Sequence, residues 1–294
     1  MITSILVGLL YLAELSVILP LHLIVLMILL REKEFNGLIA YRIMTQMSVC
    51  ECVQMIGYLL GCIMSLCQST IHPYVGMIGG CILNAGWTGV VLFVFLLTLN
   101  RFIVFSEVKL RAAAQKTLFN VLFSVTWMVC CSVFGIHLIP RFNQEYALSK
   151  NTYWFVDKVA ATVVSYGEYV FIFVTLTTTL ALCLCTVVII IIKRNLFSEK
   201  FKIASGEIKL FVQAFIIFAY MTAIRCVWQY LGPLLSGDFA FTALGMATIA
   251  VDGINPLLYI ILNRSIRSHF MRMFGFQKTT VVELSSNNKT NNSQ

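Results

Sequence analysis

The chain has 294 residues, of which 59% are hydrophobic and only 12% are charged, and its formal net charge is +8. A soluble domain carries about 25% charged residues, so this composition excludes an ordinary soluble protein, and it also excludes a largely disordered or disulfide-stapled chain. In so apolar a chain the positive charge indicates cytoplasmic loops beside anionic lipid rather than a nucleic-acid partner. We therefore expect a polytopic protein whose surroundings are the lipid bilayer.

Seven apolar stretches are each long enough to cross a bilayer as a helix. A transmembrane helix needs about 20 mostly apolar residues, whereas the strands of a barrel would be shorter and would alternate in polarity. The sequence therefore predicts an all-α membrane protein, in which a bundle of seven transmembrane helices forms one domain over residues 1–262. The predicted spans are about 5–30, 43–67, 75–99, 118–140, 163–192, 210–235 and 239–262.

The basic residues between the spans predict the orientation of the bundle. The connections on one side, at 31–42, 100–117, 193–209 and 263–294, carry 17 of the 21 Lys and Arg residues. Because such residues gather on the cytoplasmic side, we expect the N-terminus outside the cell and the C-terminus inside.

A short amphipathic element and a polar tail follow the last span. Ile266, Phe270 and Phe274 recur every four residues over 263–274, with arginines between them. This spacing predicts a helix lying in the membrane interface. The segment 275–294 is rich in Ser, Asn and Thr, so we expect a disordered cytoplasmic tail.

Two groups of ionisable residues lie within the predicted spans, where such residues indicate function. Glu14, Glu168 and Arg225 fall at similar depths in the outer half of spans one, five and six. We expect them to face a water-accessible outer cavity, with Arg225 paired to Glu168 or Glu14. The alternatives are a purely structural ion pair and, for Glu14, a side chain that reaches outward to the interface.

The second group lies deeper, where Glu51, Asp252 and Asn255 match in depth in spans two and seven. Two carboxylates so close cannot both be charged without a cation, so we expect one of them to be protonated or a sodium ion to lie between them. The group can act as a two-state switch or as fixed helix–helix contact. His22 and His137 are each expected to be buried, satisfied histidines.

The sequence contains no arrangement that predicts catalysis. A zinc-binding His-Glu-x-x-His motif, a Gly-x-Ser-x-Gly motif and a nucleotide-binding loop are missing from it. We therefore expect no enzyme activity, no metal centre and no cofactor. The loop 141–162 contains no cysteine, so any outer disulfide would have to join Cys67 to Cys81.

Landmarks in four spans resemble those of the rhodopsin-like G-protein-coupled receptors. Residues 100–102, Asn-Arg-Phe, resemble the family's Asp-Arg-Tyr motif, and residues 252–259 end in its Asn-Pro-x-x-Tyr motif. Trp127 and the segment 48–51 correspond to further landmarks in spans four and two. Residues 40–44, 86–87, 99–101 and the ending Asn-Pro-Leu-Leu-Tyr are more narrowly similar to the nematode serpentine chemoreceptors, most of all to their class T.

The resemblance implies a chemosensory receptor in the plasma membrane, within a sensory cilium, that activates a heterotrimeric G protein when a small molecule binds. It implies a ligand site between the outer ends of the spans, with Trp87, Glu168, Arg225, Trp228 and Glu14 as candidates. Span six would then move outward at its inner end.

Other residues take roles at the inner end by the same resemblance. Residues 100–102, Asn100, Arg101 and Phe102, would couple to the G protein, with Arg101 meeting it directly. Asn255, Pro256 and Tyr259 would form the switch of span seven, and Glu51 with Asp252 would replace the sodium-binding polar core of the family.

The chain departs from the family pattern at several positions. Asn100 replaces the acid that restrains the arginine, spans five and six have no proline, and the usual outer disulfide is missing. The main alternative function is a transporter or channel with a polar pathway through Glu14, Glu168, Arg225 and Asp252. Such proteins have inverted repeats and matched helix breaks, and the sequence shows neither.

Overall fold

The computed structural model describes residues 2–32, 35, 37–108, 111–156, 158–196, 205–231 and 238–275. Within these ranges seven helices are long and apolar enough to cross a membrane, which confirms the predicted all-α seven-helix bundle. In chain order the elements are α1 (Ile2–Arg31), α3 (Ile39–Cys67), α4 (Pro73–Phe105), α5 (Ala112–His137), β1 (Gln144–Ala147), β2 (Thr152–Phe155), α6 (Lys158–Leu196), α7 (Ser205–Cys226), the π-helix η1 (Val227–Leu231), α8 (Asp238–Leu262) and α9 (Arg264–Met273).

Local chemistry explains where several helices begin and end. α4 begins at Pro73, whose fixed φ suits a first helical turn, and the His72 side chain accepts a hydrogen bond from the backbone N–H of Tyr74 at 3.3 Å. α3 ends where Gln68 takes a left-handed conformation with φ of 53°. α4 also continues to Phe105, past the predicted limit at 99, because Arg101 interrupts the apolar run but not the helix.

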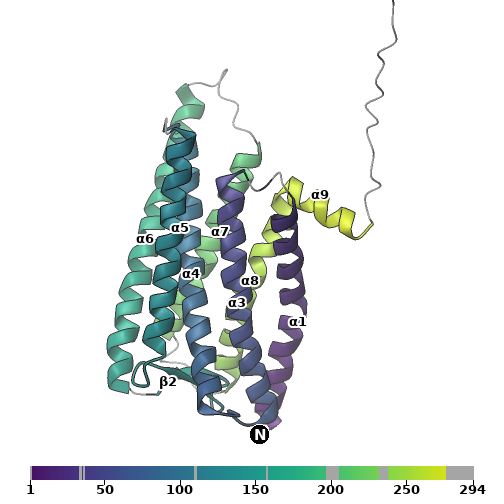
Figure 1. Ribbon diagram of the computed structural model, residues 1–294, viewed down its shortest axis with the longest axis vertical. Coiled ribbons are helices and arrows are strands. Elements are labelled where there is room, and N and C mark those ends of the chain that lie inside the picture. The colour runs from purple at the N-terminus through teal and green to yellow at the C-terminus, as the bar shows by residue number, and fades with distance from the viewer. Residues whose placement is uncertain are drawn as a thin grey trace, which may run out of the picture.

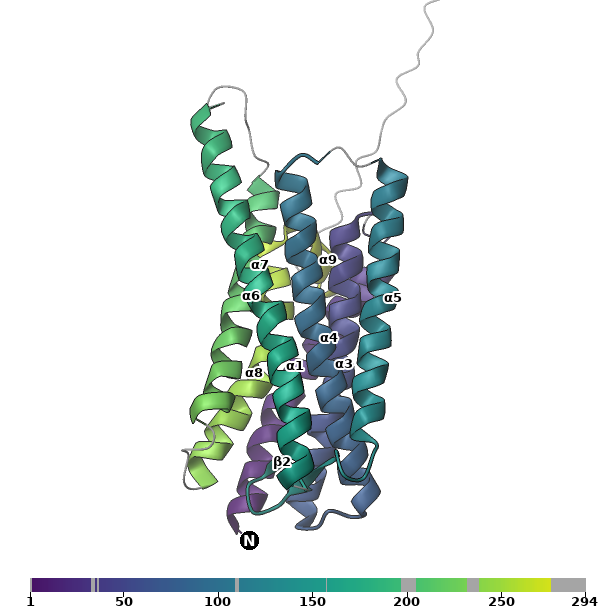
Figure 2. The ribbon, with the colours of Figure 1, turned by 90° about the vertical axis from the view of Figure 1, so that its left-hand side faces the viewer.

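α4 is the central helix of the bundle. It contacts α3, α5, α6, α7 and β1, and Figure 2 shows it between α5 at one edge and the adjacent pair α6 and α7 at the other. The main hydrophobic core therefore surrounds α4, with fully buried side chains such as Phe93, Met47 from α3, Met221 from α7 and Tyr259 from α8.

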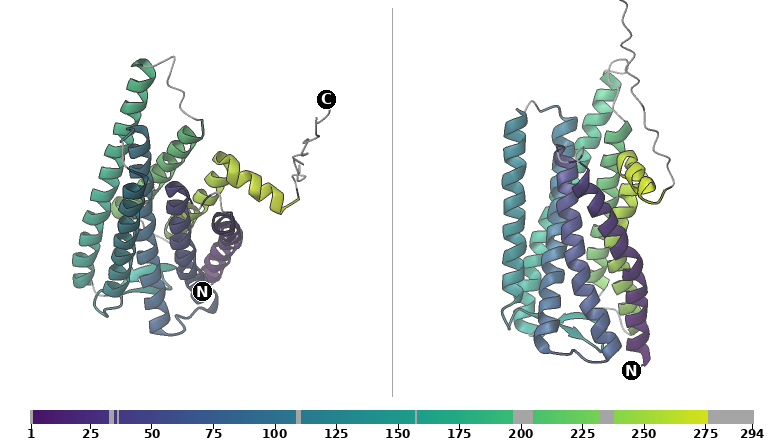
Figure 3. Two further views of the ribbon diagram at one scale, coloured as in Figure 1. Left: turned by 45° about the horizontal axis from the view of Figure 1, so that its top comes forward. Right: turned by 45° about the vertical axis from the view of Figure 1, so that its right-hand side comes forward.

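The two ends of the bundle carry different structures. The N-terminus and the β1–β2 hairpin lie at one end, and α9 leaves α8 at the other (Figure 1); both views of Figure 3 show α9 turned away from the bundle axis. We call these the hairpin end and the α9 end. The hairpin was not predicted, because strands of four residues carry too little periodicity to be recognised in a chain of apolar helices.

α9 is a capped helix that is tied to α1. The Asn263 side chain accepts hydrogen bonds from the backbone N–H groups of Ser265 and Ile266, at 3.1 and 3.3 Å, which are otherwise unpaired at a helix start. Ile266 is buried, and Nδ1 of His269 lies 2.9 Å from Oε1 of Glu32 after α1. The helix expected at 263–274 thus forms, whereas 276–294 of the expected tail lie outside the described residues.

Candidate functional site

Three hydrogen bonds hold the β1–β2 hairpin against α3. The hydroxyls of Tyr146 and Ser65 are 2.6 Å apart, Ser65 also donates to Oδ1 of Asn151 at 3.2 Å, and the Tyr153 hydroxyl donates to the carbonyl oxygen of Gly57 at 2.8 Å. These bonds tether the hairpin, which contains no cysteine. The thiols of Cys67 and Cys81, whose disulfide would have joined α3 to α4, are both free.

The two hairpin tyrosines remain neutral donors. Burial raises the pKa of Tyr146 to about 12 and also raises the pKa of Tyr153, because a buried phenolate would lose its hydration. The hydroxyls that bind α3 therefore keep their protons throughout the physiological pH range, and the hairpin does not detach by their titration.

Two glycines of α4 allow the hairpin to approach closely. A Cβ at Gly80 would lie 2.7 Å from the backbone oxygen of Gln144, and one at Gly79 would overlap the hydroxyl of Tyr153. A side chain at either position would push the hairpin away from the bundle. The packing of α4 thus sets the height of the hairpin above the helices.

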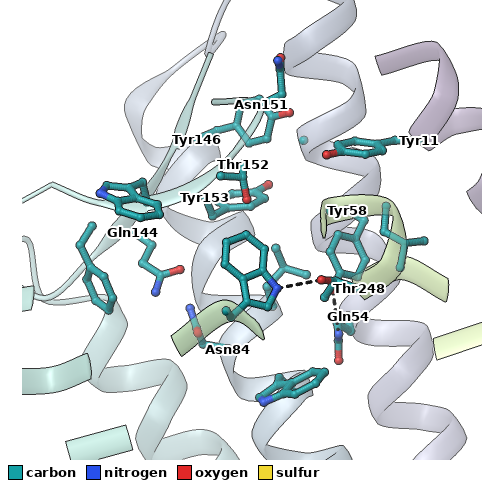
Figure 4. A pocket seen from close by; sticks show the side chains of 18 of the residues that line it. Tyr11, Gln54, Tyr58, Asn84, Gln144, Tyr146, Asn151, Thr152, Tyr153 and Thr248 are labelled. Carbon is teal, nitrogen blue, oxygen red and sulfur yellow. Dashed lines mark hydrogen bonds between the residues drawn. The ribbon is translucent and has the colours of Figure 1, made fainter. Parts of the chain in front are cut away.

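A cavity of about 360 Å³ lies beneath this hairpin, between it and the helices. Figure 4 shows Tyr146, Thr152 and Tyr153 of the hairpin on one side and Gln54, Tyr58 and Thr248 of α3 and α8 on the other. The volume and the mixture of aromatic and amide side chains suit a small molecule. The described lining residues are Tyr11, Gln54, Tyr58, Gly61, Leu83, Asn84, Trp87, Gln144, Tyr146, Asn151, Thr152, Tyr153, Trp154, Phe155, Ser165, Arg225, Trp228, Gln229, Gly245, Thr248 and Ile249.

Three of the predicted ligand-binding residues line this cavity, namely Trp87, Arg225 and Trp228. Trp228 lies in η1 and its indole N–H donates to the Thr248 hydroxyl at 2.8 Å, which connects span six to span seven. The π-helix begins directly after Arg225 and Cys226. Such wider turns recur at functional sites, and this one stands where the sequence lacks the proline expected from the family.

The other two predicted ligand-binding residues lie outside the lining. Glu168 is bonded to His137, with Oε1 2.5 Å from Nε2, so the predicted ion pair with Arg225 does not form. Glu14 lies within electrostatic range of Asp252 and Tyr58 instead. The sequence provides the depth of a residue in the membrane but not the direction in which its helix is rotated. Among the described residues Arg225 forms an ion pair with neither Glu168 nor Glu14, and Glu168 is bonded to His137 instead.

The predicted deep polar group forms, and it includes one more residue than expected. The side-chain amide of Asn255 donates to Oε1 of Glu51, and both side chains are buried with Asp252. His22 completes the group. Its Nε2 lies 2.7 Å from the carbonyl oxygen of Asp252, and its Nδ1 lies 3.4 Å from Oε2 of Glu51.

The hydrogen bond of His22 determines which proton the imidazole carries. A carbonyl oxygen only accepts, so Nε2 of His22 donates to Asp252, and Nδ1 of a neutral ring then faces Glu51 as an acceptor. His22 was expected to be buried and satisfied. It is buried, but within the described part of the chain its Nδ1 has no hydrogen bond, and neither carboxylate oxygen of Asp252 has one.

The α9 end of the bundle is closed around the predicted coupling residues. Asn100 and Arg101 are only 3% and 2% exposed, and the rings of Phe105 in α4 and Phe211 in α7 pack edge to face with centroids 6.3 Å apart. Phe102 is half-buried beside them. In this arrangement of the helices the side chain of Arg101 is therefore not exposed to a partner.

The comparison with known families decides the class of the protein. The sequence model described as "Serpentine type 7TM GPCR chemoreceptor Srv" matches residues 11–276, which extend from α1 to the end of α9. The chain belongs to the Srv family of serpentine chemoreceptors. A search of curated proteins gave no match.

Membership of the Srv family confirms the expectation of a serpentine chemoreceptor, which was drawn from residues 40–44, 86–87, 99–101 and the ending Asn-Pro-Leu-Leu-Tyr. The family is Srv, whereas the narrower motif comparison was with class T. It is a family of receptors and not of enzymes, and it favours a receptor over the transporter or channel that the charged spans also allowed. The Srv chain is a multi-pass membrane protein.

The residues that sequence reasoning missed in this Srv receptor are those of the hairpin and His22. Tyr146, Asn151 and Tyr153 lie in a loop whose aromatic and amide residues were a usable signal, since such side chains in an outer loop commonly cover a site. His22 offered no signal, because a single histidine in an apolar helix is usually no more than a packed side chain.

Proposed function

We propose that this Srv receptor is a chemosensory receptor of the plasma membrane that binds a small molecule in the cavity under the hairpin. The observation that carries the proposal is the position of that cavity. It is lined by Trp87, Arg225 and Trp228 at the hairpin end, while Arg101 is buried toward the α9 end of the same helix as Trp87.

The orientation of the receptor follows from its basic residues. The connections at the α9 end carry most of the Lys and Arg, which supports a cytoplasmic α9 end. The hairpin and the cavity then face the outside of the cell, where an odorant or other environmental molecule arrives. A sensory cilium is the location we propose for such a receptor.

Ligand binding would drive the receptor by favouring a second arrangement of the helices. A ligand shifts the equilibrium only if it binds that arrangement more tightly. In the present arrangement Phe105 and Phe211 close the α9 end. We propose that outward movement of α7 parts these rings, exposes Arg101 and lets a heterotrimeric G protein bind through the charged hydrogen bonds that arginine forms.

The deep polar group of His22, Glu51, Asp252 and Asn255 lies where the helices of the bundle could change between two arrangements. Pro256 removes a backbone hydrogen bond from α8, beside Asn255 and one turn before Tyr259. The unpaired oxygens of Asp252, with Oε2 of Glu51, fit a hard monovalent cation. A sodium ion held by them would offset the charge of one of the two carboxylates when bound.

Nucleotide exchange on a G protein tests the proposed function. Cells expressing the receptor with an N-terminal tag are sorted by antibody without permeabilisation, and small molecules are then added to the medium. We expect tagged cells to stain and at least one compound to accelerate exchange. If the N-terminal tag is reached only after permeabilisation, or if compounds that bind leave exchange unchanged on every G-protein class, the proposed function is wrong.

A further inference from the structure

Arg225 lies between two cavities of the bundle. It lines the cavity under the hairpin, and it also lines a second cavity of about 280 Å³ between α6 and α7. The change from α-helix to π-helix begins two residues later. Around this change Trp228 and Gln229 line the first cavity and Tyr230 the second, so the two cavities lie on different sides of one short segment.

Arg225 is the only charged residue among the described residues that line either cavity. Its Nε is buried and has no hydrogen-bond acceptor in the described part of the chain. Glu168 lies within electrostatic range, but its carboxylate is held by His137 at 2.5 Å. A partly buried guanidinium whose Nε lacks an acceptor among the described residues is costly, so the site is complementary to an anion.

The second cavity is built for an apolar chain. It is lined by Phe173 and Leu180 of α6 and by Phe218 of α7, among others. The hydroxyls of two further lining residues, Tyr169 and Tyr230, are hydrogen-bonded at 2.7 Å. Phe173 is 54% exposed on the outside of the bundle, which faces lipid. The cavity is therefore reachable from the bilayer.

We propose that the ligand of this receptor is a carboxylic acid carried on an apolar chain. The carboxylate binds the guanidinium of Arg225, which matches it with two parallel hydrogen bonds, and the chain lies in the cavity between α6 and α7. The proposal rests on the proposed function, because it names the ligand class for the same site. The acid arrives either from water through the cavity under the hairpin or from the bilayer between α6 and α7.

The test is binding of matched acids and alcohols to the full receptor in nanodiscs of uncharged lipid. The probes are butanoate, octanoate and dodecanoate, each compared with the primary alcohol of equal length, and the readout is the shift in melting temperature with concentration. We expect octanoate to bind at least about tenfold more tightly than octanol. Varying the amount of lipid distinguishes an acid that arrives from water from one that arrives from the bilayer. In the second case the measured affinity depends on the mole fraction of acid in the lipid and not on its total concentration.

Three variants locate the two parts of the ligand. Arg225→Gln should remove the preference for acid over alcohol, and Arg225→Lys should keep part of it because lysine retains the charge but not the planar fork. Thr222→Trp fills the cavity between α6 and α7 and should weaken dodecanoate while leaving butanoate unchanged. Arg141→Gln, an exposed arginine that lines neither cavity, should behave like the wild type.

The proposal is wrong if no acid of the series shifts the melting temperature of the wild type, if alcohols bind as well as acids, or if Arg225→Gln keeps the full preference. Each of these results leaves the proposed function intact, since that is measured by nucleotide exchange with ligands of any charge. Conversely, if acids bind through Arg225 but never change the rate of nucleotide exchange, the proposed function is wrong while the proposed acid site is supported.

Discussion

Replacing Arg101 by alanine is expected to reduce ligand-driven nucleotide exchange by at least about tenfold, close to the rate without ligand, because the charged bonds that hold the G protein are lost. Ligand affinity should not change. Arg101 lies about 25 Å along α4 from Asn84 at the cavity, at about 1.5 Å per residue. The measurement is the exchange rate at saturating ligand together with the ligand affinity of the same preparation.

Two further variants keep this test interpretable. Arg101→Lys keeps the charge and should retain an intermediate rate, so a folding defect of the alanine variant is distinguished from a loss of coupling. Arg141→Ala removes an exposed arginine near the hairpin and should exchange at the wild-type rate. Wild-type exchange by a folded Arg101→Ala receptor would show that this arginine does not contact the G protein.

Filling the cavity under the hairpin is expected to have the second large effect. Asn84 lines the cavity, and its side-chain amide donates to the carbonyl oxygen of Gly80 within α4 at 2.9 Å. In Asn84→Trp the indole occupies ligand space, so we expect affinity to fall by roughly 100-fold, consistent with a loss of several buried contacts. Exchange without ligand should be unchanged, because the α9 end is untouched.

The matched control introduces the same side chain outside the cavity. Ser132 is exposed on α5 and its hydroxyl bonds to the carbonyl oxygen of Met128 at 2.8 Å. Ser132→Trp should therefore bind ligand and signal normally. If Asn84→Trp binds and signals as well as Ser132→Trp does, the ligand site lies elsewhere in the receptor.

The helices could be predicted because each is defined by the length and apolar composition of a continuous stretch of sequence. Length and apolar composition alone predict seven spans, and the structure has seven helices of that kind within its described residues. Depth along the helices also predicted that Glu51 lies beside Asn255. In the structure the side-chain amide of Asn255 donates a hydrogen bond to Glu51. These features depend on the distance of a residue from a helix end, which a sequence provides.

The features that could not be predicted depend on how each helix is rotated about its axis and on contacts between segments far apart in sequence. Glu168 was expected beside Arg225 but faces His137 of α5, and a depth estimate cannot distinguish these two neighbours. The hairpin is set by the contacts of Tyr146 and Tyr153 with α3 and by close approach to Gly80, which are far apart in sequence. The π-helix that places Trp228 has no sequence signal of the kind that proline provides.

A ligand in the cavity under the hairpin is expected to open the opposite end of the bundle. The direct measurement is the distance between spin labels at Val104 of α4 and Ile208 of α7, both exposed near the α9 end, attached through non-natural amino acids because several native cysteines are exposed. We predict that ligand lengthens this distance by several ångström in the wild type and not in Asn84→Trp. An unchanged distance in a receptor whose ligand drives nucleotide exchange would contradict the account.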